Sequence, residues 1–106
     1  MKKEIKNFMA KFGEIIGSNI PVLIDFYTDW KDASDDLHSV LRDVAAALGD
    51  KAKVIKIDVD KNEILANALR IKGNPTFIIY KEGEMKWRQT GEQDANTLIN
   101  LVEQYV

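Results

Sequence analysis

One stretch of the chain decides the fold: Val22-Leu23-Ile24-Asp25-Phe26-Tyr27. It follows Pro21 and is apolar or aromatic at every position except Asp25. A short apolar run bounded by a turn residue is typical of a central strand that is buried on both faces. We therefore expect a sheet built around this strand, with one carboxylate inside it.

Helical patterns alternate with strand-like runs on both sides of this strand. Apolar residues at helical spacing predict helices over 5–16, 37–48 and 64–69, and a final helix that begins at a capping residue, Asp94. Strands are predicted over 54–59, 76–80 and 85–90, and the last two form a hairpin around Glu82-Gly83.

The order α-β-α-β-α-β-β-α predicts an α/β fold with a four-stranded mixed sheet. We expect two parallel crossovers, one antiparallel hairpin, and helices on both faces of the sheet, all in a single domain over residues 1–106. In the last strand, alternation places Met85, Trp87 and Gln89 on one side of the sheet, with Trp87 in the core or half-buried.

The composition excludes several classes of protein. The 106 residues contain no cysteine, which rules out a disulfide framework, a zinc-thiolate site and a thiol nucleophile. The formal net charge of -2 argues against a nucleic-acid partner. No apolar run approaches the ~20 residues that span a bilayer. The first six residues start like a signal peptide, but no apolar stretch follows, so we expect a bacterial, cytoplasmic chain.

Four stretches of the chain, taken in order, carry a resemblance to a known family. The first runs through the central strand to Trp30, and the second is Val54-Ile55-Lys56-Ile57-Asp58-Val59-Asp60-Lys61-Asn62. The third is Ile71-Lys72-Gly73-Asn74-Pro75-Thr76-Phe77, and the fourth is Trp87-Arg88-Gln89-Thr90-Gly91. Together, and in this order, they resemble the thioredoxin family. The resemblance implies the thioredoxin fold for nearly the whole chain, without the N-terminal strand of the longer members.

The chain departs from the family at its centre, where Trp30-Lys31-Asp32-Ala33-Ser34 replaces Trp-Cys-Gly-Pro-Cys. Lys31 and Ser34 stand where the two cysteines are expected. Thiol–disulfide exchange needs a thiolate that attacks and a second thiol that resolves the mixed disulfide. An amine and a hydroxyl cannot replace them, so we expect no disulfide oxidoreductase activity.

The altered loop is acidic, and two interpretations of its charges stay open. The carboxylates of Asp32, Asp35 and Asp36, beside Ser34, can act as capping anions at a helix N-terminus, or can form a patch that binds a basic partner. The acids lack the spacing of a calcium loop, and we expect no metal, no cofactor and no catalytic residue. A non-redox enzyme that uses Lys31, Ser34 or the acids is the remotest alternative.

The resemblance also implies a shallow groove for an extended peptide. Its predicted residues are Trp30, Asn74, Pro75, Thr76 and Gly91, with a cis peptide bond before Pro75. Asn74 makes the groove polar, so we expect a protein or peptide partner that is polar or basic. A structural subunit of a larger assembly is the alternative.

Asp25 corresponds to the buried aspartate of the family. We expect it to be buried with a raised pKa, because burial disfavours the charged form of a carboxyl. Ser34, Lys56 or a water could donate a hydrogen bond to it, and an ion pair with Lys56 would move the pKa the other way.

Overall fold

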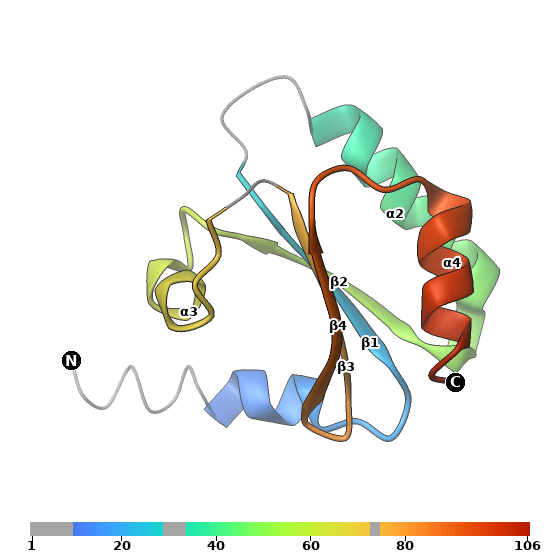
Figure 1. Ribbon diagram of the computed structural model, residues 1–106, viewed down its shortest axis with the longest axis horizontal. Helices are drawn as coiled ribbons and strands as arrows, with labels where there is room; N and C mark the ends of the chain where they lie inside the picture. The colour runs from blue at the N-terminus through green and yellow to red at the C-terminus, as the bar shows by residue number, and fades with distance from the viewer. Residues whose placement is uncertain (1–9, 29–33, 73–74) are drawn as a thin grey trace.

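The computed structural model describes residues 10–28, 34–72 and 75–106, and of residues 34–37 only the main chain (Figure 1). Residues 10–16 are helical. The elements that follow are β1 (Val22–Tyr27), α2 (Ser34–Leu48), the 3-10 turn η1 (Gly49–Lys51), β2 (Lys53–Asp58), α3 (Glu63–Ala68), β3 (Thr76–Lys81), β4 (Glu84–Thr90) and α4 (Ala95–Glu103).

The four strands form one mixed sheet in the order β2-β1-β3-β4. Helices α2 and α4 lie on one side of this sheet, and α3 and residues 10–16 lie on the other side (Figure 1). The predicted four-stranded mixed sheet with helices on both faces is therefore confirmed.

The core has two halves, one on each face of β1. Leu23 packs with side chains of α2 and α4, including Val44 and Leu98. Ile24 and Phe26 point the other way and pack with a second cluster, whose members are Phe12, Val22, Leu65, Ile78 and Tyr80. The side chains of β1 from Val22 to Phe26 are completely buried, as expected for a central strand.

The prediction of two parallel crossovers is wrong. β1 and β2 are parallel, but β3 runs antiparallel to β1, with Thr76 opposite Phe26. The reason is the length of α3, whose six residues span about 9 Å at 1.5 Å per residue. A six-residue strand is about 20 Å long. The chain therefore does not travel back along the sheet, and β3 starts at the edge where β1 and β2 end.

The alternation expected in the last strand is also wrong, because a β-bulge interrupts it. The register shifts between Ile79 and Tyr80, so that Trp87 lies opposite Ile79 and Met85 lies opposite Tyr80. Ile79 and Tyr80 belong to the two different core halves. Met85 and Trp87 are thus on opposite faces. Trp87 is half-buried against the half that contains Leu23, as predicted.

Candidate functional site

Several predicted site residues lie outside the described part of the chain. These residues are Trp30, Lys31, Asp32, Ala33 and Asn74. Ser34 begins α2, and only its main chain is described. The predicted roles of this loop, and the predicted cis bond before Pro75, therefore stay predictions.

Three predicted groove residues come together where β3 begins and β4 ends. The Gly91 N–H donates a hydrogen bond of 2.9 Å to the Pro75 carbonyl oxygen. One residue further into the sheet, the hydroxyl oxygens of Thr76 and Thr90 are 3.2 Å apart. Gly91 has a φ of +111°, which favours glycine because it has no Cβ. Pro75, Thr76 and Gly91 therefore form one fixed corner of the sheet.

Asp25 is a completely buried carboxyl at the centre of the sheet. Neither of its oxygens has a hydrogen-bond partner among the described residues. Removal from water raises the pKa of Asp25 to about 7, and the positive charge of Lys56 partly opposes this rise. Lys56 lies opposite Asp25 in the β1–β2 register. Near neutral pH the carboxyl is therefore protonated in about half of the molecules.

Lys56 makes no hydrogen bond to Asp25 but approaches His38 of α2 instead. The Lys56 Nζ is 3.5 Å from the His38 Nδ1. Because an ammonium group can only donate, Nδ1 is the acceptor in this contact. Nε2 is buried and has no partner among the described residues. The His38 ring also packs edge-to-face against Tyr27, with centroids 5.6 Å apart.

Sequence reasoning missed His38 and assigned it no role. The neighbours of His38 come from α2, β1 and β2, and only the packing of these elements brings them together. The expected contact between Lys56 and Asp25 was the one signal in the sequence that pointed to part of this cluster. The resulting cluster (Asp25, His38 and Lys56) holds groups that can carry protons, but the described residues place no nucleophile beside them.

The arrangement of these elements defines the fold. A four-stranded sheet with one parallel pair and two antiparallel pairs, covered by helices on both faces, is the thioredoxin fold. A family model described as Thioredoxin matches residues 3–104. The chain therefore belongs to the thioredoxin family.

Individual relatives agree with this assignment. A chloroplastic thioredoxin Y of Oryza sativa subsp. japonica is 39% identical over 92% of this chain, but this match spans only 59% of that relative's length. A thioredoxin-like protein of Synechocystis sp. is 34% identical, over 96% of this chain and 98% of its own. These names include a chloroplast protein, so they do not fix a compartment.

Solved structures show the same likeness in three dimensions. A thioredoxin variant from Halobacterium salinarum has a TM-score of 0.78 and 35% identity, over 91% of this chain and 83% of its own. Chloroplastic thioredoxin z has a TM-score of 0.79 and 30% identity, over 92% of this chain and 88% of its own. Among the described residues, no helix is long and apolar enough to cross a membrane.

Proposed function

We propose that this chain is a redox-inactive thioredoxin-family module that binds an extended protein segment without chemistry. The absence of cysteine supports the first part of the proposal, that the chain is redox-inactive. Disulfide exchange requires a thiolate, and the 106 residues hold none. The binding surface of the proposal is the groove defined by Trp30, Asn74, Pro75, Thr76 and Gly91.

The fixed corner at Pro75 supports the second part of the proposal, that the chain binds an extended segment. A binding surface works best when its main chain is held in place before the partner arrives, because less ordering is then needed on binding. The hydrogen bond from Gly91 to Pro75 and the Thr76–Thr90 hydroxyl contact hold the two sides of this corner together. These contacts are formed in a chain without cysteine, and neither involves the Trp30–Ser34 loop.

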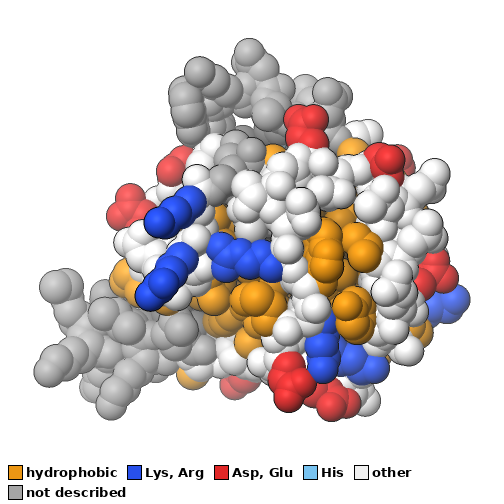
Figure 2. Space-filling view, in the orientation of Figure 1, with side chains coloured by type: hydrophobic (Ala, Val, Ile, Leu, Met, Phe, Trp, Pro, Cys, Tyr) orange, Lys and Arg blue, Asp and Glu red, His pale blue; other side chains and the backbone are white. Residues whose placement is uncertain are grey.

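The surface charges fit a protein partner better than a nucleic acid. In the view of Figure 2, a few basic side chains gather at the left, acidic side chains lie around the rim, and no basic stripe crosses this face. Nucleic-acid binding needs a basic patch or stripe instead. We expect the partner segment to be polar or basic, which would complement the four acids at positions 29, 32, 35 and 36.

A subunit role has less support among the described residues. A surface that is covered by a permanent partner is rich in contiguous apolar side chains. The large exposed hydrophobic residues of the described chain are Ile64, Met85 and Val106, which lie on α3, on β4 and at the C-terminus. They therefore come from three separate elements.

A capture experiment with two matched variants tests the proposal. The chain and its variant with Trp30→Ala and Asn74→Lys are used as baits in lysate of the source cells, and captured proteins are identified by mass spectrometry. We expect a partner that the variant loses. The control is Glu103→Gln at the exposed end of α4, which should retain the partner. A partner that both variants retain would place the interface elsewhere and favour the subunit role.

A further inference from the structure

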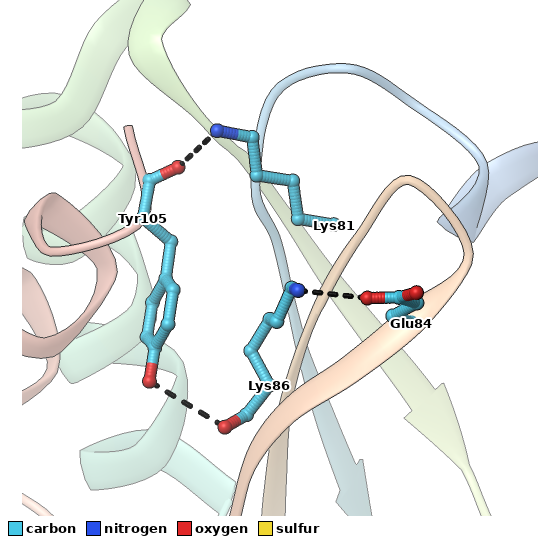
Figure 3. A network of polar contacts seen from close by, with 4 residues as sticks. All are labelled: Lys81, Glu84, Lys86 and Tyr105. Carbon is cyan, nitrogen blue, oxygen red and sulfur yellow. Dashed lines mark hydrogen bonds and ion pairs between the residues drawn. The ribbon is translucent and has the colours of Figure 1, made fainter.

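The two edges of the sheet differ in how their main-chain groups are covered. At the β4 edge, the Tyr105 hydroxyl donates to the Lys86 carbonyl oxygen at 3.4 Å (Figure 3). The Lys81 Nζ fixes Tyr105 through its carbonyl oxygen at 2.7 Å, and Lys86 pairs with Glu84 at 2.8 Å. The C-terminal residues therefore cover part of this edge.

At the β2 edge, some main-chain groups have no partner among the described residues. The Lys53 N–H donates to the Pro21 carbonyl oxygen, and the Val59 N–H donates to the Tyr27 carbonyl oxygen. In a parallel pair, alternate residues face the neighbouring strand, so the odd-numbered residues of β2 bond to β1. The N–H and C=O groups of Val54 and Lys56 therefore point away from β1, and they have no partner among the described residues.

A pocket lies beside this edge on each face of the sheet. On the α2 face, a pocket of about 480 Å³ is lined by Leu41, Ala45 and Val54, together with His38, Arg42 and Lys56. On the opposite face, a pocket of about 470 Å³ is lined mainly by Phe12, Ile15, Ile55, Ile57 and Leu65. Side chains of an extended strand point alternately to the two faces of a sheet. A strand added along β2 would thus place successive side chains in one pocket and then the other.

The charges around the two pockets are mostly positive. Their linings contain four basic side chains (Lys11, Arg42, Lys56 and Lys61) and one acidic side chain, Asp58. One oxygen of Asp58 already accepts hydrogen bonds from the Asp60 and Lys61 main-chain N–H groups. An incoming segment with carboxylates would therefore meet more positive than negative side chains.

We propose that the β2 edge binds an extended segment of a partner protein that combines apolar and acidic residues. The segment adds a fifth strand to the sheet. Main-chain hydrogen bonds to Val54 and Lys56 hold it, while the two pockets select its side chains. This surface is separate from the groove at Pro75, and the proposal does not depend on that groove.

A second copy of the chain is a poor occupant of the same edge. β2 itself carries Lys53 and Lys56. Pairing two β2 edges would bring lysines of one copy near lysines of the other, and like charges across a strand pair are destabilising. Lysines on an edge strand are a common means of preventing this kind of self-association.

A synthetic peptide tests the proposal directly. The probe is the peptide Glu-Val-Ile-Glu-Val-Ile-Glu with both ends blocked. The control peptide has lysine in place of each glutamate. We expect the acidic probe to shift the NMR signals of the Val54 and Lys56 amides and to slow their hydrogen exchange. The lysine peptide should bind at least about tenfold more weakly, since the edge is basic.

Two variants at one position separate the main-chain contact from side-chain packing. Val54→Pro removes an N–H that β1 does not use, and proline is tolerated in an edge strand when its nitrogen faces outward. It should weaken binding of the acidic probe about tenfold, the loss expected for one hydrogen bond. Val54→Thr keeps the N–H and should bind within about threefold of the original chain.

Several results would overturn the proposal. These are signal shifts confined to Pro75, Thr76 and Gly91, equal binding of the two peptides, or unchanged binding by a folded Val54→Pro variant. Concentration-dependent dimerisation through β2 in sedimentation would also overturn it. If Val54→Pro does not fold, the hydrogen-exchange rates of Val54 and Lys56 in the original chain decide the matter.

Discussion

At the scale of single residues, Asp25 is the feature that most needs an explanation. A buried carboxylate without a hydrogen bond is costly, and a group in this position reduces the cost by remaining protonated. The pKa of about 7 expresses that balance between burial and the opposing charge of Lys56. The chain has no thiol with which Asp25 could exchange a proton, so its burial is a cost without a redox benefit.

The raised pKa of Asp25 predicts that stability falls as the pH rises. Between pH 4 and pH 7 the native state binds more protons at Asp25 than the unfolded state, so the free energy of unfolding decreases across this range. A shift of about three units corresponds to roughly 4 kcal/mol. Asp25→Asn should therefore match the original chain near pH 4 and be more stable by up to about 4 kcal/mol at pH 8. Denaturant unfolding at both pH values measures this difference.

The control for this experiment is Asp60→Asn, which removes an exposed carboxylate from the turn after β2. Its unfolding is measured at the same two pH values and serves as the reference for a carboxylate that is not buried. A stability difference between Asp25→Asn and the original chain that does not change with pH would contradict the prediction.

At the scale of elements, the β3–β4 turn holds strain that a substitution can relieve. Glu82 and Gly83 both have positive φ, at 54° and 82°, as in the type I′ turns of two-residue hairpins. Asparagine tolerates this region better than glutamate does. Glu82→Asn should therefore raise the free energy of unfolding by about 0.5–1 kcal/mol. Thermal unfolding compares it with Glu82→Ala, which removes the charge but keeps the strain and should show no such gain.

Arg88 of β4 forms hydrogen bonds to the two residues that follow α3. Its guanidinium donates to the Leu69 carbonyl oxygen at 2.6 Å and to the Arg70 carbonyl oxygen at 2.9 Å. Arg88→Ala should lower the free energy of unfolding by about 1–3 kcal/mol, the range for hydrogen bonds to charged groups. Urea unfolding measures this loss. Arg88→Lys keeps the charge but not the two-pronged geometry, so its loss should be intermediate. A lysine variant as stable as the original chain would show that the positive charge, and not the two-pronged geometry, stabilises the fold.

The sequence predicted the elements better than it predicted their connections. The bounds 22–27 of the central strand agree with the structure, because an apolar run after Pro21 is a strong local signal. Helix α2 begins at Ser34, three residues before the predicted start at Leu37, because the polar residues of its first turn carry no apolar periodicity. The direction of β3 and the bulge in β4 depend on the sheet as a whole, and neither leaves a local pattern.

The candidate site, too, could be predicted from the sequence only in part. The burial of Asp25 follows from its position inside an apolar strand, and the grouping of Pro75 with Gly91 follows from the family resemblance. The contact between His38 and Lys56 joins residues 18 positions apart on two different elements. No spacing rule connects them, so only the packed structure reveals this pair.

At the scale of the whole molecule, the fold of the family is present while its reactive groups are absent. The central sheet, both core halves and the corner at Pro75 are formed without any cysteine. Catalysis in such a molecule depends on groups placed on a rigid scaffold and not on the scaffold alone. Replacing the reactive groups should therefore restore chemistry without redesigning the fold.

Lys31→Cys combined with Ser34→Cys tests this idea. The two thiols would stand where the family has its cysteines, near a helix N-terminus that lowers a thiol pKa. We expect the double variant to reduce the disulfides of insulin with dithiothreitol as the electron source, faster than either single variant, since a lone thiol cannot resolve a mixed disulfide. Insulin precipitation gives the rate. Adding Asp25→Asn should slow this reaction if the buried carboxyl can accept a thiol proton. A double variant that forms its disulfide but reduces no insulin would show that changes elsewhere, such as Asn74, have also removed the substrate surface.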